Sequence, residues 1–268
     1  MFKDITLGQF FPGDSVVHKM DPRVKLVLTV MFIVMLFSAK NFYGLLVGIA
    51  FTIMTYLLSR IPFVMILKSM KPIIPIVVFT AVLNLFFIRT GRMLWHFGFV
   101  KIYDDGLNTA VFMVVRIICL IVGSSLLTYT TSPIDLTDAI ERLLSPLKKL
   151  GAPVHELAMM MTIALRFIPT LIEETDKIMN AQKARGSELD TGTFREKVRG
   201  MVPIFIPLFV SSFRRAEELA TAMECRCYHG GEGRTRMKQL STAPRDWLAC
   251  LYVALFWAGV ILMNQFFK

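Results

Sequence analysis

The sequence predicts an all-α integral membrane protein with about five transmembrane helices and a module of long amphipathic helices. Of its 268 residues, 54% are hydrophobic and only 19% are charged, and the mean hydropathy is +0.57. A water-soluble domain has about a quarter charged residues, so a soluble chain of this composition would expose too much apolar surface. Long uncharged stretches recur, and 31 of the 50 charged residues lie within residues 133–245.

Uncharged stretches mark the expected spans, because a charge at the bilayer centre is costly. About 20 apolar residues cross the hydrocarbon core of ~30 Å. The stretches cover residues 26–39, 41–59, 72–88, 106–134 (with Arg116 as the single charge) and 247–267. Lys40 and Asn41 are expected to form a tight turn between the first two spans, and Pro72 and Pro75 lie near the start of the third.

The chain is expected to have three parts: a membrane-spanning region (1–132), an amphipathic module (133–245) and a C-terminal transmembrane helix (246–268). Five spans place the two ends on opposite sides. With the N-terminus inside, 24 Lys and Arg residues lie on the cytoplasmic side and five lie outside. If the module is left out of the count, seven lie on the cytoplasmic side and five outside. Cytoplasmic segments are enriched in Lys and Arg, so this orientation is favoured, and the net charge of +10 requires no nucleic acid.

The module has the pattern of helices rather than of a loop. A helix start follows Ser132, and two long helices are expected over about 153–186 and 195–226. Each long helix has an apolar first half and a polar second half. Neither apolar half is long enough to span a bilayer, so we expect both to pack together at the cytoplasmic face.

An enzyme would need a set of converging polar residues. The phosphate-binding pattern GxxxxGK[ST] is absent, so the chain is not expected to hydrolyse ATP by itself. His155 begins a motif like HExxH, but Met159 stands in place of the second His. Glu173, Glu174 and Asp176 fall within one helical turn and could bind Mg²⁺, although a solvated helix face explains them better. No catalytic residue is expected, and a membrane enzyme is the weaker alternative.

Other candidate sites are incomplete. Cys225, Cys227 and His229 lack the fourth ligand of a structural zinc site, so neither a metal nor a cofactor is expected. Arg116 and Arg166 are isolated cations in apolar segments. Such a charge marks either a functional site or a structural contact in the bundle, and Arg116 leaves a self-contained secondary transporter as an alternative. Arg166 is expected to join helices.

Two arginines stand between small residues at the ends of the long helices. The two triplets are Ala184, Arg185, Gly186 and Cys225, Arg226, Cys227. Locally, a Gly cap and an Arg at the negative end of the helix dipole explain the first. Alternatively, a projecting guanidinium with small neighbours can enter a groove on another protein and bind carboxylates or carbonyls. Two such ends indicate two partner molecules.

Three segments resemble the transmembrane (T) component of energy-coupling factor transporters. They are DSVVHKMDPRVKL (14–26), TTSPIDLTDAIERLLSPLKKLGAPVHELAMMMTIALRFIPTLIEETDKIMNAQKARG (130–186) and AMECRCYHGGEGRTR (222–236), and the resemblance covers nearly the whole chain. In that family this subunit is the scaffold of a vitamin and metal-ion importer in a prokaryotic cell membrane. Two ABC-type ATPase subunits bind its cytoplasmic face, and a small membrane substrate-binding (S) component binds its helices.

The resemblance implies roles for single residues. The two X-Arg-X motifs of the family, which insert into grooves on the ATPases, match Arg185 and Arg226. Cys225 and Cys227 stand where the family commonly has Ala and Gly. Cys is small enough to preserve the insertion, and Gly230–Gly231 offer an alternative helix end one turn later.

The resemblance also suggests how the apolar half of the first long helix acts. Met159, Met160 and Met161 are candidate contacts with the S component, because methionine repacks easily. The implied mechanism is mechanical, since closure of the ATPase pair would shift the helix ends and move the apolar halves beneath the S component. The substrate is not encoded in this chain, because the S component recognises it.

Overall fold

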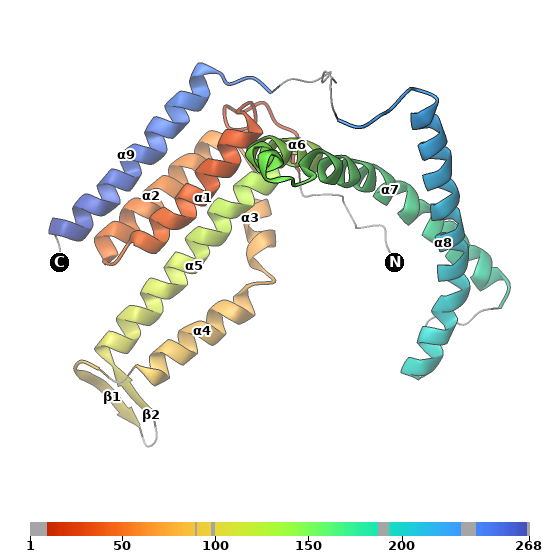
Figure 1. The fold of residues 1–268 in the computed structure, drawn as a ribbon. Helices are drawn as coiled ribbons and strands as arrows, with labels where there is room; N and C mark the ends of the chain where they lie inside the picture. The colour runs from red at the N-terminus through yellow and green to blue at the C-terminus, as the bar shows by residue number, and fades with distance from the viewer. Residues whose placement is uncertain (1–9, 89, 98–99, 187–192, 232–239, 267–268) are drawn as a thin grey trace. The chain divides into compact units, whose positions relative to one another are not determined.

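The computed structural model describes residues 10–88, 90–97, 100–186, 193–231 and 240–266. The chain forms two compact units. The membrane unit contains Gly8–Ala139 and Leu240–Lys268, and the amphipathic unit contains Ile140–Gln239. Figure 1 shows the helices and strands of both.

Most helices of the membrane unit lie at the uncharged stretches that predict spans. Its elements are α1 (Pro22–Ser38), α2 (Phe42–Ser59), α3 (Phe63–Met70), α4 (Ile74–Phe87), β1 (Met93–Phe97), β2 (Val100–Tyr103), α5 (Asp104–Thr130), the start of α6 (Pro133–Leu144) and α9 (Pro244–Phe266). The helices α2, α5 and α9 are long and apolar enough to cross a membrane. α1 has 17 residues, rises about 26 Å and packs against α5 and α9. The prediction of an all-α membrane protein is confirmed.

The third expected span differs from the prediction. It is formed by α3 and α4, which together pass as one span bent by 61°. Proline lacks a backbone N–H and cannot donate the hydrogen bond that continues a helix. Pro72 therefore separates the helices, and Pro75 lies in the first turn of α4, where proline is tolerated.

A β-hairpin between α4 and α5 was not predicted. β1 and β2 are antiparallel, and Phe97 pairs with Val100. The hairpin leads directly into α5, which begins at Asp104. It is the only strand pair in the described part of the chain.

The amphipathic unit contains the end of α6, the 3₁₀ helix η1 (Ser145–Leu150), α7 (Val154–Ala184) and α8 (Phe194–Glu224). The two 31-residue helices α7 and α8 pack against each other. The prediction that the apolar half of α7 is too short to span needs correction. The helix continues through Pro169, and an 18-residue window of α7 is long and apolar enough to cross a membrane.

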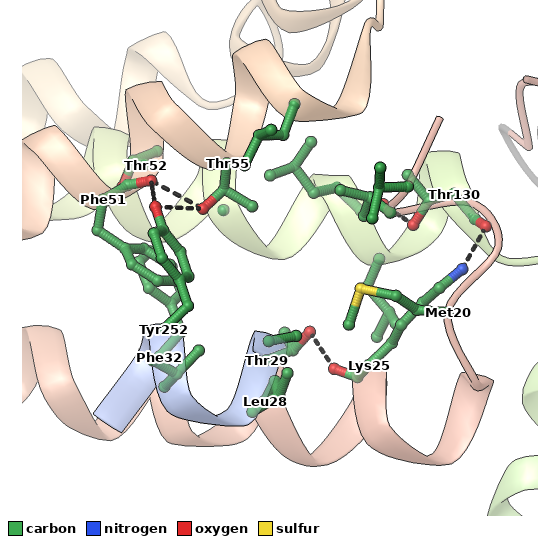
Figure 2. Close-up of a pocket in the computed structure, with 18 of the residues that line it drawn as sticks. Met20, Lys25, Leu28, Thr29, Phe32, Phe51, Thr52, Thr55, Thr130 and Tyr252 are labelled. Atoms are coloured by element: carbon green, nitrogen blue, oxygen red, sulfur yellow. Dashed lines mark hydrogen bonds between the residues drawn. The ribbon is translucent and has the colours of Figure 1, made fainter. Parts of the chain in front are cut away.

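The core of the membrane unit lies between α1, α2, α5 and α9. Phe51 stacks on Phe32 with ring centroids 5.2 Å apart and on Tyr252 with centroids 5.0 Å apart. Beside this stack is a cavity of about 350 Å³, lined by apolar side chains and by Lys25 at one end (Figure 2). Threonine hydroxyls in its wall, such as that of Thr29, donate to backbone carbonyls of their own helices.

Gly123 allows α5 to approach α1 closely. A Cβ atom at position 123 would lie 2.1 Å from Cε1 of Phe32, a ring that is almost fully buried. We expect Gly123→Ala to lower the free energy of unfolding by about 1–3 kcal/mol through overpacking. Thermal unfolding of the detergent-solubilised protein measures this. Gly259→Ala is the control, because its Cβ would meet only Val47 at 3.6 Å. Equal midpoints for the two variants would contradict the prediction.

Candidate functional site

The first arginine end lies at the C-terminus of α7. Ala184 is the last helical residue, and Arg185 occupies the C-cap with φ −85° and ψ 6°. Gly186 follows in the left-handed region with φ +83°, and its N–H donates to the carbonyl of Lys183 at 3.0 Å. Glycine adopts this conformation without steric cost. The chain therefore turns sharply after Arg185, as the Gly cap in the sequence predicts.

The second end has the same geometry without a glycine. α8 ends at Glu224, and Cys227 has φ +54°. The N–H of Cys227 donates to Glu224 O at 2.9 Å, and that of Tyr228 donates to Met223 O at 3.1 Å. These two bonds form a Schellman motif, which satisfies the last helix carbonyls. The alternative helix end at Gly230–Gly231 is therefore wrong.

The matching geometry places both arginines alike, each immediately before a left-handed residue. A non-glycine residue in this region costs about 1–2 kcal/mol. We therefore expect Cys227→Gly to raise the free energy of unfolding by about 1 kcal/mol, measured by thermal unfolding. Cys225 does not have a positive φ, so Cys225→Gly should lower stability. The prediction fails if both substitutions shift the midpoint in the same direction.

Contacts between α7 and α8 set the positions of the two ends. The Glu174 carboxylate accepts from the Ser211 hydroxyl and, at 2.7 Å, from Nη2 of Arg215. Farther along α7, Nε2 of Gln182 donates to the carbonyl of Pro203 at 3.4 Å. The two helices therefore run in opposite directions where they cross, so the C-terminal part of α7 lies against the N-terminal part of α8 (Figure 1).

The crossing places the two arginine ends on opposite sides of it. Arg185 follows Glu174 by 11 residues and Arg226 follows Ser211 by 15. At 1.5 Å per residue these segments extend about 16 Å and about 22 Å in opposite directions. Both arginines are exposed, and among the described residues neither guanidinium has a hydrogen-bond or ion-pair partner. The geometry presents two separate cationic ends.

The acidic cluster on α7 has a structural contact that the sequence did not predict. The solvated-face interpretation is wrong for Glu174, whose side chain is 21% exposed and paired with Arg215. Its neighbour Glu173 is exposed. The enzyme alternative depended on this cluster as a Mg²⁺ ligand set, and Glu174 is instead engaged by α8.

The methionines lie far from Arg185 along α7. Met160 and Met161 are exposed near the start of α7, and Met159 is half-buried. They precede Arg185 by 24 to 26 residues, or about 36–39 Å of helix. Arg166 is exposed on α7 and has no hydrogen-bond or ion-pair partner in the described ranges, so the contact between helices expected of it is not seen there.

Arg116 binds the turn between α1 and α2. Its Nη2 donates to the carbonyl of Ala39, which is the C-cap of α1, and its guanidinium lies 4.5 Å from the ring centroid of Phe112. On the same turn, Nδ2 of Asn264 in α9 donates to Ser38 O at 2.8 Å, and its Oδ1 accepts from Lys40 N at 3.1 Å. Arg116 thus has structural contacts. Asn264 was not predicted from the sequence, where its signal is an amide in an apolar span.

Comparison with known proteins gives a consistent result. Residues 13–237 match the family described as cobalt transport protein (CbiQ). A protein of Ruminiclostridium cellulolyticum named energy-coupling factor transporter transmembrane protein EcfT is 52% identical over 267 residues, which is 100% of both chains. Proteins of the same name from Clostridium kluyveri and Bacillus subtilis are 55% and 50% identical, over 94% and 92% of this chain and 93% of their own lengths. The resemblance predicted from the sequence is confirmed: the chain belongs to the EcfT family and is a prokaryotic membrane subunit of an energy-coupling factor transporter.

Proposed function

We propose that the chain is the scaffold that couples ATP hydrolysis by two ABC-type ATPase subunits to movement of a substrate-binding S component. The observation that carries this proposal is the pair of matched helix ends. Arg185 and Arg226 occupy equivalent positions before left-handed residues, on opposite sides of one helix crossing. Two equivalent cationic ends suit two similar partners, each offering a groove with carboxylate or carbonyl groups.

In this proposal each triplet forms one ATPase contact. Ala184 and Gly186 flank Arg185, and Cys225 and Cys227 flank Arg226. Small neighbours leave room for a groove wall beside the guanidinium. The chain itself hydrolyses no ATP and holds no cofactor, because the chemistry belongs to the ATPase subunits.

The S component is proposed to contact exposed apolar surface of the amphipathic unit. On α7 this surface includes Met160 and Met161. On α8 it includes Phe205, Phe209 and Phe213, which are exposed and follow one another with ring centroids 6.4 Å and 4.6 Å apart. Apolar patches of this kind mark protein or membrane contacts. The excess of Lys and Arg supports placing this unit on the cytoplasmic side with the N-terminus inside.

Co-purification from the native membrane tests the proposal. The tagged chain is expected to bring down two ATPase subunits and one small membrane protein, and vesicles with the complex should take up substrate only when supplied with ATP. The purified chain alone should not hydrolyse ATP. Uptake by the chain alone, driven by an ion gradient, would contradict the scaffold proposal and favour a secondary transporter.

A further inference from the structure

Three buried charged residues meet where α1 and α9 begin, inside the membrane unit. Asp21, Lys25 and Asp246 are only 5%, 6% and 2% exposed. Burying a charge is costly unless it is paired and hydrogen-bonded. Each of these residues is hydrogen-bonded, and their contacts join separate segments of the chain.

Asp246 joins the N-termini of two helices. It lies in the first turn of α9, where its Oδ2 accepts from the N–H of Ala243 at 2.7 Å. Its Oδ1 accepts from the N–H of Asp21, the N-cap of α1, at 3.0 Å. Free N–H groups and the positive end of the helix dipole both favour a carboxylate at this place. One carboxylate therefore stabilises the start of α1 and the start of α9 together.

Arg23 extends this contact to the segment that enters α9. Its Nη2 donates to the Asp21 carboxylate at 2.6 Å and to the carbonyl of Leu240 at 3.3 Å. Leu240 is the first residue of the chain that returns from the amphipathic unit to the membrane unit. Arg23 and Asp246 therefore hold the returning segment at Leu240 and Ala243.

Lys25 holds the segment that leaves the membrane unit. Its ammonium group donates to Thr130 O at 2.9 Å (Figure 2). It also donates to the hydroxyl of Thr131 at 3.4 Å and to His18 O at 3.0 Å. Thr130 is the last residue of α5, and the chain continues from there into α6 and the amphipathic unit. The first turn of α1 thus binds both connections between the two units.

We propose that Arg23, Lys25 and Asp246 are positioning residues that transmit movement of the amphipathic unit to the membrane helices. This inference rests on the proposed function. The connection at Thr131–Ser132 is two residues long, and α6 continues from it into the amphipathic unit. The described end of the returning connection, Leu240–Ala243, is not helical, and unless it is bound it would bend instead of transmitting a displacement. Lys25 ties α1 to the first connection, and Arg23 and Asp246 tie it to the membrane end of the second. A displacement that arrives through either connection therefore reaches α1, α5 and α9 together.

The test uses the complete transporter in lipid vesicles, where ATP hydrolysis and substrate uptake are measured in the same sample. Lys25→Met removes the ammonium group and keeps a side chain of similar length. Asp246→Asn keeps the side-chain shape but turns an amide N–H toward one of the backbone N–H groups that the carboxylate accepts from. In both variants we expect unchanged subunit stoichiometry and an uptake per ATP hydrolysed that falls about tenfold. Lys25→Arg should recover most of this ratio, because it restores a cation able to donate to the same carbonyls.

Two controls separate transmission from general weakening. Lys19→Met removes a lysine whose exposed side chain pairs with exposed Asp14 at 3.2 Å, and it should behave as wild type. Gly123→Ala weakens the same helix bundle without touching these contacts. A ratio that falls equally in Gly123→Ala, or stays unchanged in Lys25→Met and Asp246→Asn, would overturn the inference.

If Lys25→Met does not assemble, Thr131→Val replaces it, since it removes only one of the three acceptors, and a ratio equal to wild type would again overturn the inference. The proposed function fails in a different way. In that case the wild-type chain would bind no ATPase and show no ATP-dependent uptake.

Discussion

Replacing Arg185 and Arg226 together with alanine is expected to abolish ATP-driven uptake while this chain still folds. Both side chains are exposed, so their removal costs little folding free energy. Loss of a guanidinium buried against partner carboxylates or carbonyls costs about 2–5 kcal/mol of binding, which corresponds to a contact roughly 30- to 4,000-fold weaker. Co-purification of the ATPases and uptake by reconstituted vesicles measure the two consequences.

Arg214→Ala provides the matched control for this experiment. Arg214 is an exposed arginine on α8, twelve residues before Arg226 and away from the helix end. Its substitution should leave ATPase binding and uptake at wild-type levels. The single variants Arg185→Ala and Arg226→Ala should each weaken one contact. Normal ATPase binding and normal uptake in the double variant would refute the role proposed for both arginines.

Local sequence was sufficient to predict three of the spans and one helix end. A charge is costly wherever it enters the bilayer, so the penalty can be read along the chain without knowing the fold. α2, α5 and α9 accordingly lie at the uncharged stretches 41–59, 106–134 and 247–267. The end of α7 also depends on neighbouring residues, because Gly186 supplies the left-handed conformation that the cap requires.

Features that depend on distant segments could not be predicted in this way. Asp246 binds the backbone of Asp21 across 225 residues, and Asn264 binds that of Ser38 across 226. Nothing near either residue in sequence indicates its partner. The conformation of Cys227 could not be predicted for a different reason. Its left-handed φ is one that cysteine disfavours locally. There, satisfaction of the last carbonyls of α8 outweighs a conformational cost of about 1–2 kcal/mol.

Glu174→Gln is expected to weaken the crossing of α7 and α8 and to uncouple the two arginine ends. The carboxylate accepts from both Ser211 and Arg215, and the amide replaces one acceptor with a donor and removes the charge. Hydrogen bonds to charged groups contribute about 1.5–3 kcal/mol, and the 35% exposure of Arg215 places the expected loss toward the lower value. Thermal unfolding measures the loss, and uptake per ATP hydrolysed measures its effect on transport.

Glu173→Gln distinguishes this contact from the general acidity of the helix. Glu173 is the adjacent residue, carries the same charge and is exposed, so its substitution changes the net charge equally without touching α8. If the crossing keeps the two arginine ends at a fixed separation, only Glu174→Gln should reduce stability and uptake. Because Arg185 and Arg226 lie on opposite sides of Glu174, a displacement at one end can reach the other through this packed crossing. Equal behaviour of the two glutamine variants would mean that the helix ends act independently.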